Sequence, residues 1–251
     1  EDCVKQGIDL KKMKSLWYRL FGVDLRQPND ILDLFFSTIV KQYSEPRRRY
    51  HVLSHIEEGL DLLEEHRTLV NSYFHVAYAF WLHDIFYNPK MSDNEKNSAF
   101  LASGWLGLIL SHIPAIRIMP SNSPAQEISN NQELVTDLIL ATRHQERQID
   151  PDCQLICDLD LYRLTGEHQK EDIEDIRFEY MHLGEKEWVT GRLKFLRGIL
   201  ERGYIFQTPE FILRFEEKAR QNIKSQITEF ENKLASLDRP KSNFNLLTIF
   251  S

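Results

Sequence analysis

The sequence predicts an all-α protein, and three observations support this fold class. Nearly every periodic segment of the 251-residue chain repeats its apolar residues three and four positions apart, the spacing of one helix face. No segment shows the apolar–polar alternation of a half-buried strand. The composition, 42% apolar and 27% charged, is that of an ordinary globular protein with enough chain for a large core. We expect one domain over residues 10–237, a helical bundle with additional C-terminal helices, and a tail over 238–251.

The first predicted helices lead to a pair of histidines and a long apolar segment. Residues 30–43 carry apolar side chains on one face, and residues 50–70 are expected to form the next helix. His51 and His55 would lie one turn apart on it. Residues 73–82 are almost entirely apolar and predict a buried helix, because a helix that is apolar all round has no face suited to solvent.

The middle of the chain predicts a helix, a loop and a second helix. Ser92 and Glu95 have the spacing of a capping box, so a helix is expected to start there and to continue as a buried segment over 99–109. Glu95 is interpreted as the capping acid rather than as a catalyst. Residues 119–131 hold two prolines among Ser and Asn and are expected to form a loop, either a lid or a plain insertion. Residues 134–144 are again expected to be helical.

Four further segments with helical spacing follow towards the C-terminus. They are expected over residues 152–164, 168–182 and 185–200, and from Thr208 onwards. Thr208 suits the N-cap of the last helix and Pro209 its first position, where a missing backbone N–H costs nothing.

The charge of the chain argues against one class of partner. There are 38 acidic and 31 basic residues, a net charge of −7, and no broad basic face that a nucleic-acid polymer would need. Small anionic substrates remain compatible with this charge, because a metal ion can hold them locally. The one basic run, Arg47-Arg48-Arg49, is interpreted as a solvated turn after Pro46.

Cysteine content and hydropathy suggest a cellular location. Cys3, Cys153 and Cys157 are too few for a disulfide framework, which favours a reducing compartment. The most apolar window, residues 100–116, is shorter than the about 20 residues that span a bilayer. With no visible signal peptide, we expect a soluble cytoplasmic protein without membrane partners.

The stretch Trp81-Leu82-His83-Asp84-Ile85-Phe86-Tyr87 closes the predicted buried helix. A carboxylate in such an apolar setting must be paired, hydrogen-bonded or metal-bound, because its charged form is costly to bury. Taken alone, the His83-Asp84 pair is explained by a helix end, where histidine complements the dipole and aspartate caps a turn.

Other polar residues in apolar helical settings favour a shared metal ion instead. They are His51, His55, His144, Asp158 and Asp160. Residues on separate helices of a bundle can converge on one ion in its core. Imidazole and carboxylate ligands together suit Mn²⁺, Fe²⁺, Co²⁺, Ni²⁺ or Zn²⁺ better than Ca²⁺. Without a cysteine ligand nearby, a catalytic rather than a structural ion is indicated.

Longer motifs add a family resemblance to this pattern. They are Tyr50-His51-Val52-Leu53-Ser54-His55-Ile56, the stretch from Trp81 to Tyr87, and Asp93-Asn94-Glu95-Lys96-Asn97-Ser98, followed by similar residues at 141–144, 158–161, 176–180 and 191–192. The chain resembles the HD-domain superfamily of metal-dependent phosphohydrolases, in particular a subgroup of predicted metal-dependent HD phosphohydrolases. The likeness covers roughly residues 10–237 and implies an HD-domain-like helical bundle.

The resemblance implies a ligand set for one divalent ion, which could be Mn, Co, Ni, Fe, Zn or Mg. Carried over position by position, it makes His55, His83, Asp84 and Asp160 the metal ligands. Asp160 is preferred to Asp158, because the superfamily commonly ligates with the Asp before an apolar helix.

The resemblance also implies roles around the ion. Asp84 or a neighbouring acid would orient a metal-bound water. His51 and His144 would line the site, where they would either stabilise phosphate or the leaving oxygen or complete a second metal position. Arg177 and Tyr180, one turn apart, are candidates for holding a phosphate of the substrate. The implied reaction is hydrolysis of a small phosphoester, such as a nucleotide. Relatives often have Asp where this chain has Asn88, which either removes a chemical group or preserves a turn cap.

Two other functions and a further partner stay open. One alternative is a non-catalytic HD domain that binds a nucleotide or a protein partner. The other is a di-iron HD-type oxygenase, which would need both His51 and His144 as metal ligands. A homodimer formed through the helices after His168 is also compatible with the sequence.

Overall fold

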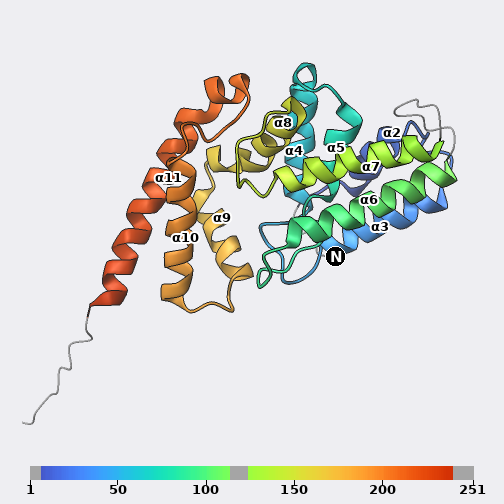
Figure 1. Ribbon diagram of the computed structural model, residues 1–251. Helices are drawn as coiled ribbons and strands as arrows, with labels where there is room; N and C mark the ends of the chain where they lie inside the picture. The colour runs from blue at the N-terminus through green and yellow to red at the C-terminus, as the bar shows by residue number, and fades with distance from the viewer. Residues whose placement is uncertain (1–6, 114–123, 240–251) are drawn as a thin grey trace, which may run out of the picture.

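The structure is a computed structural model that describes residues 7–113 and 124–239. These residues form ten α-helices and two 3₁₀-helices and contain no β-strand, which confirms the predicted all-α fold (Figure 1). The α-helices are α2 (Leu10–Leu20), α3 (Asp30–Tyr43), α4 (Leu53–Glu65), α5 (Tyr73–Leu82), α6 (Asn94–His112), α7 (Pro124–Ala141), α8 (Pro151–Leu161), α9 (Gln169–Glu179), α10 (Glu185–Leu200) and α11 (Pro209–Asp238). The 3₁₀-helices are η1 (Arg67–Leu69) and η2 (Tyr162–Thr165).

Local sequence signals place several helices correctly. Helices α3, α5 and α10 begin and end at the predicted residues. Helix α11 begins with Pro209, and the hydroxyl of Thr208 accepts a hydrogen bond from the N–H of Phe211, as an N-cap does. Helix α2 has no counterpart among the predicted helices. Its N-terminus is capped by the Asp9 carboxylate, and its buried side chains include Met13 and Trp17.

The prediction of one continuous helix over 50–70 is wrong at both ends. Helix α4 ends at Glu65, and the short helix η1 follows it. Helix α4 begins only at Leu53, so His51 lies before the helix and not one turn from His55 on it. The reason is a distant carboxylate. One oxygen of Glu179 accepts hydrogen bonds from the backbone N–H groups of three successive residues, Arg49, Tyr50 and His51. This segment therefore bends around Glu179 instead of coiling into α4.

The predicted capping box is also wrong, because Asp93 rather than Ser92 is the N-cap of α6 and no side chain caps that end. The start of α6 is fixed instead by two residues that face each other. The Asn94 side chain accepts a hydrogen bond from the N–H of Asn88 at 2.9 Å and donates one to its carbonyl at 3.0 Å. Glu95 therefore does not act as a capping acid.

The predicted loop over 119–131 is wrong for its second half. Residues 124–131 belong to α7, which starts with Pro124, a residue tolerated in the first turn of a helix. The remainder, 119–123, lies outside the described residues. The predicted tail over 238–251 lies outside them as well, except for Asp238, which ends α11, and Arg239.

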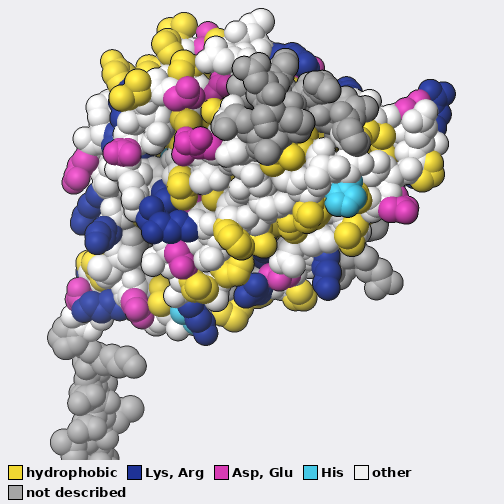
Figure 2. All heavy atoms as spheres, turned by 45° about the vertical axis from the view of Figure 1, so that its right-hand side comes forward, with side chains coloured by type: hydrophobic (Ala, Val, Ile, Leu, Met, Phe, Trp, Pro, Cys, Tyr) yellow, Lys and Arg dark blue, Asp and Glu magenta, His cyan; other side chains and the backbone are white. Residues whose placement is uncertain are grey.

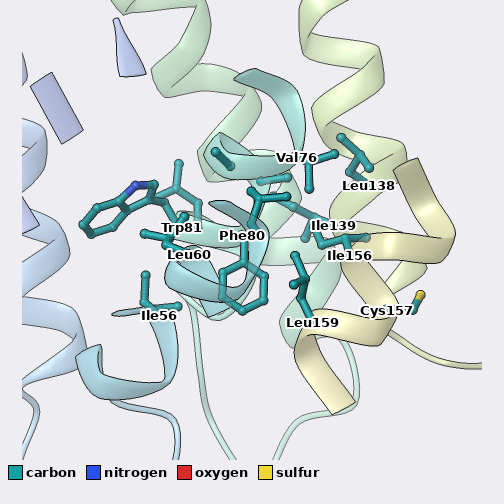
Figure 3. Packing of buried hydrophobic residues seen from close by; sticks show 14 of the residues in the cluster. Ile56, Leu60, Val76, Phe80, Trp81, Leu138, Ile139, Ile156, Cys157 and Leu159 are labelled. Atoms are coloured by element: carbon teal, nitrogen blue, oxygen red, sulfur yellow. The ribbon is translucent and has the colours of Figure 1, made fainter. Parts of the chain in front are cut away.

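Helix α5 is the centre of the hydrophobic core. Every residue from His75 to Leu82 is buried, as expected for a helix that is apolar all round. Figure 3 shows side chains of α4, α7 and α8 around it. The labelled core residues are Ile56, Leu60, Val76, Phe80, Trp81, Leu138, Ile139, Ile156, Cys157 and Leu159.

A glycine sets the distance between α4 and α5. A Cβ atom at Gly59 would lie 2.0 Å from the Phe80 ring, so only glycine permits this approach. Gly59 is one turn after His55, and Phe80 is one turn before His83. The close contact therefore brings His55 and His83 to the same height along the packed pair of helices α4 and α5.

Helices α9, α10 and α11 lie together on one side of the molecule, beside the group formed by α2 to α8 (Figure 1). Helix α10 packs along α11. Buried residues of both groups belong to one hydrophobic cluster that extends from Ile8 to Phe230. The C-terminal helices are thus packed onto the rest of the core.

Two further features of the fold are the charge on its surface and the length and hydropathy of its helices. Figure 2 shows basic and acidic side chains interspersed on the coloured part of the face that it presents, with apolar side chains scattered among them. Within residues 7–113 and 124–239, none of the helices is both long and apolar enough to cross a lipid bilayer.

Candidate metal centre

The structure brings the four expected metal ligands together from three helices. His55 lies on α4, His83 and Asp84 follow the end of α5, and Asp160 lies on α8. One ligand atom from each of His55, His83 and Asp84 falls within 4.8 Å of the other two. One Asp160 oxygen, Oδ1, lies 3.1 Å from Nε2 of His55 and 3.3 Å from Nε2 of His83. Both imidazoles therefore lie close to carboxylate oxygens, and Nε2 of His83 lies within 3.3 Å of both Asp84 and Asp160.

The protonation of His83 suits a metal ligand. Its Nδ1 lies 2.9 Å from the carbonyl of Phe80, an acceptor, so Nδ1 carries the proton and Nε2 keeps a lone pair in the neutral ring. That buried Nε2 lies 3.2 Å from Oδ2 of Asp84 and 3.3 Å from Oδ1 of Asp160. Burial alone would lower the pKa of His83, but Asp84 and Asp160 outweigh burial and raise the pKa well above its ordinary value. The site thus favours positive charge at Nε2.

Both carboxylates are ionised at neutral pH. Burial favours their protonated forms, yet His83 and His51 outweigh it at Asp84 and lower the pKa of that carboxyl. Hydrogen bonds from His144, His55 and His83 likewise lower the pKa of Asp160 well below its ordinary value, against the effect of burial. Charged oxygens beside a lone-pair nitrogen are the donor set expected for a divalent transition metal, so these residues fit such an ion.

His144 reaches the centre through an unusual turn. It follows the end of α7 with a backbone φ of 52°, the left-handed region that a side chain with a Cβ rarely adopts. Its Nε2 lies 2.7 Å from Oδ2 of Asp160, and Arg202 donates a hydrogen bond to its carbonyl oxygen. Such backbone strain costs about 1–3 kcal/mol and persists where surrounding contacts impose it. The turn directs the imidazole at the aspartate.

A buried glutamate of α9 orients His51. Nδ1 of His51 lies 2.6 Å from Oε2 of Glu179, and its ring stacks on Tyr87 at 4.3 Å. Glu179 also accepts the Tyr87 hydroxyl at 2.8 Å, in addition to the three backbone N–H groups. Burial opposes ionisation of Glu179, but His51 and these donors outweigh it and lower its pKa to about 2. The ionised glutamate holds the Nδ1–H of His51.

Glu179 is a functional residue that the sequence analysis missed, although the motif of residues 176–180 contains it. The roles were assigned to its neighbours Arg177 and Tyr180. A usable signal was available, because Glu179 lies three positions after Ile176, a spacing that places both on one buried helix face.

The structure does not bring Arg177 to the site. Its guanidinium donates to the carbonyls of Tyr180 and Leu183 and to the carboxylate of Glu185, and it joins the end of α9 to the start of α10. The expected phosphate-binding role of Arg177 is therefore corrected to a structural one. Tyr180 does line the cavity at the centre.

Arg48 is the second residue that sequence reasoning missed. The basic run was expected to be solvated, but the Arg48 side chain is only 4% exposed. Its guanidinium donates to the carbonyl oxygens of Asp84 and Ile85 at 2.6 and 3.0 Å. Arg48 thus fixes the backbone of Asp84, one of the candidate metal ligands. No periodic pattern could single it out from Arg47 and Arg49.

The two aspartates of α8 have separate roles. Asp158 is fully buried and accepts hydrogen bonds from the N–H groups of Gln207 and Thr208 and from the Thr208 hydroxyl. It therefore anchors the start of α11, while Asp160 faces the centre. Asn88 likewise has a local role, since its side chain accepts the N–H of Lys90 as a turn cap.

A cavity of about 530 Å³ opens onto the candidate metal centre. His51, His83, Asp84, His144 and Asp160 line it on one side. Other lining residues are Tyr50, Tyr87, Glu95, Arg143, Tyr180, Trp188, Arg192 and Arg202. A volume of this size suits a compact organic ligand. Comparison of the chain with protein-family models, with curated proteins and with solved structures gave no match.

Proposed function

We propose that this protein is a metal-dependent phosphohydrolase of the HD-domain type that acts on a small phosphoester. The observation that carries the proposal is the convergence of His55, His83, Asp84 and Asp160. Of these, His83, Asp84 and Asp160 line a cavity of about 530 Å³. The order of these residues in the sequence, together with the resemblance described above, supports the same reaction class.

The four residues would hold one divalent ion, with Mn, Co, Ni, Fe, Zn and Mg as candidates. Once bound, such an ion would polarise a phosphoryl oxygen of the substrate and would lower the pKa of a bound water from near 16 towards about 7. Asp84 lines the cavity beside its partner His83, and its carboxylate can accept a proton of the attacking water. His83 is kept in its ligating tautomer by the carbonyl of Phe80.

His51 and His144 would act on the phosphate. Because Glu179 holds Nδ1–H of His51, the opposite ring nitrogen is left for the cavity. Burial lowers the pKa of His51, but Glu179 and Asp84 outweigh it and raise the pKa, which favours a protonated ring. A protonated ring there donates to a phosphate oxygen or to the leaving oxygen. His144 is held by Asp160 on the same wall.

The substrate is proposed to be a compact phosphorylated molecule, such as a nucleotide, and not a nucleic-acid polymer. A polymer binder spreads many basic residues over successive phosphates. This chain has an excess of seven negative charges, and the face in Figure 2 mixes both signs. We place the reaction in the cytoplasm, in agreement with the free, buried thiols of Cys153 and Cys157.

The test combines a metal count with a substrate panel. Elemental analysis after gentle purification should give about one transition metal per chain, and nucleotides or sugar phosphates should release phosphate with Mn²⁺ or Co²⁺. Two irons per chain would favour the oxygenase alternative, and bound metal without turnover would favour a binding domain. Robust cleavage of a polynucleotide beside an inert small-molecule panel would refute the substrate class.

A further inference from the structure

Arg192 is a cation on the cavity wall without an acidic partner. It lies on α10 and lines the cavity. Its guanidinium donates to the amide oxygen of Gln226 at 3.2 Å and lies 5.1 Å from the Phe195 ring. Its buried Nε has no hydrogen-bond partner, and it forms no ion pair with any residue that the structure describes. The hydrogen bond and the cation–π contact of its guanidinium are thus made with a neutral amide and an aromatic ring.

Other arginines of the C-terminal helices do not share this situation. Arg177, Arg197 and Arg220 each pair with a glutamate, at 3.2, 2.6 and 2.6 Å. Arg163 pairs with Glu58 at 2.8 Å. An unpaired buried cation is costly, because desolvation is not offset by an opposite charge. Burial accordingly lowers the pKa of Arg192. A missing counter-charge at a cavity wall points to a ligand that supplies it.

Arg192 and the candidate metal ligands reach the cavity from different elements. Arg192 lies on α10, whereas His83 and Asp84 follow α5 and Asp160 lies on α8. Among the described residues, the ion pairs of Asp84 and Asp160 are with histidines and not with Arg192. The guanidinium is therefore available to an anion in the cavity without being held by the carboxylates of the candidate metal centre.

We propose that Arg192 forms an anion subsite for a second oxyanion of the substrate, a phosphate or a carboxylate, distinct from the phosphoester at the metal centre. Its planar guanidinium presents paired donors that match such an anion. Tyr50 adds a hydroxyl nearby, and burial raises its pKa, so the hydroxyl remains a donor. The assignment of the substrate as doubly anionic rests on the proposed phosphohydrolase function, whereas anion binding by Arg192 does not.

The first experiment measures anion binding without metal. EDTA-treated protein is titrated with inorganic phosphate by calorimetry, for the wild type, Arg192→Gln and Arg197→Gln. Arg197 is the matched control, because it lies on the same helix but pairs with Glu231 at the surface. Arg192→Gln should raise the Kd for phosphate at least tenfold, and Arg197→Gln less than twofold. Equal Kd values for Arg192→Gln and the wild type would overturn the subsite.

A stability measurement separates this role from a structural one. Without phosphate, Arg192→Gln should unfold at the same temperature as the wild type or higher, because it removes a partly buried cation that has no acidic partner. A lower unfolding temperature with an unchanged phosphate Kd would mean that Arg192 is structural. If Arg192→Gln does not fold, Arg192→Lys keeps the charge but loses the planar donor pair, and should raise the Kd at least threefold. The cavity residue Arg143 provides a further control, since loss of binding only in Arg143→Gln would place the anion elsewhere.

The second experiment addresses the substrate class with metal-loaded protein. Phenyl phosphate has one anionic group, whereas carboxyphenyl phosphate and phenylene bisphosphate add a carboxylate or a phosphate. The wild type should prefer a doubly anionic ester at least tenfold in kcat/KM, and Arg192→Gln should lose the preference. The two added groups distinguish a carboxylate subsite from a phosphate subsite. Hydrolysis without preference would overturn the doubly anionic substrate and leave the hydrolase intact. No hydrolysis, with phosphate binding that depends on Arg192, would refute the hydrolase alone.

Discussion

Oδ1 of Asp160 lies 3.1 Å from Nε2 of His55, although 105 residues separate them in the sequence. The contact joins α8 to α4 at the point where α5 ends, and the same carboxylate reaches His83 and His144 through its two oxygens. Asp160 therefore contacts three histidines of the site, His55, His83 and His144. Its neighbour Asp158 offers a matched comparison two positions away.

Asp160→Asn and Asp158→Asn should have opposite effects. Asp160→Asn should lower the metal content at least tenfold with little loss of fold, because it removes a charged ligand at a cavity wall. Asp158→Asn should keep the metal and lose about 1–3 kcal/mol of unfolding free energy, because charge-assisted bonds to the start of α11 weaken. Elemental analysis and urea unfolding measure the two effects. Metal loss in Asp158→Asn alone would contradict the assignment.

Asp84→Ala should remove activity but not structure. The backbone at Asp84 is held by Arg48 through carbonyl oxygens, which the substitution leaves in place. We expect phosphoester turnover to fall at least about a thousandfold, the scale of losing a group that orients a nucleophile. Circular dichroism should remain helical. An unfolded variant would mean that the pair of His83 and Asp84 is structural.

Removal of the metal should lower the unfolding temperature. A ligand at 100 times its Kd stabilises the folded state by about 2.7 kcal/mol, and each kcal/mol shifts the unfolding temperature of a domain of this size by about 2–4 °C. EDTA-treated protein should therefore gain roughly 5–10 °C when Mn²⁺, Co²⁺ or Ni²⁺ is added. Differential scanning fluorimetry makes the measurement, and no gain with any of these ions would count against the site.

Gly59→Ala should disturb the centre from a distance. The new Cβ would meet the Phe80 ring and push α4 from α5, at a cost of about 1–3 kcal/mol for overpacking. Because His55 and His83 flank this contact, metal affinity should fall as well. Gly104→Ala on α6 is the control, since a Cβ there meets nothing within 4 Å. That variant should be neutral or slightly stabilised, by up to about 1 kcal/mol.

Glu179→Gln should change how stability depends on pH. The pKa of Glu179 is about 2 in the folded protein, against an ordinary value of 4.5. A lowered pKa contributes stability that is complete above about pH 5 and is lost as pH falls towards 2, by an amount on the order of 3 kcal/mol. The wild type should thus exceed Glu179→Gln in unfolding free energy at pH 6, with the difference shrinking between pH 5 and 2. Urea unfolding across this range provides the check, and a difference that does not vary with pH would argue against an ionised Glu179.

Much of the fold could be predicted from local signals. The bounds of α3, α5 and α10 agree with the sequence pattern because apolar periodicity and flanking residues determine them. The start of α4 could not be predicted, because it depends on Glu179. This residue accepts a hydrogen bond from the backbone N–H of His51, although 128 residues separate the two in the sequence. The start of α6 depends in the same way on the facing pair of Asn88 and Asn94.

The candidate site was predictable where family resemblance provides the positions, as for His55, His83, Asp84 and Asp160. Their spacing alone cannot select Asp160 over Asp158, since both lie in the same apolar segment and only tertiary contacts distinguish them. Arg48 carries no local signal, and Arg192 belongs to a motif of the resemblance that implies no role for it. An arginine in a polar run and an arginine after a glycine acquire their roles from what packs against them.

The division of the cavity between two groups of helices has a consequence for how substrate preference can change. The proposed metal ligands come from α4, α5 and α8, whereas Arg192 and Trp188 come from α10. Substitutions on α10 can therefore alter which molecule is accepted while the reactive centre keeps its geometry. Glu179 is the exception, because this residue of α9 also orients His51. Substitutions at the last turn of α9 should therefore disturb the reactive centre, whereas substitutions on α10 should act on the choice of substrate.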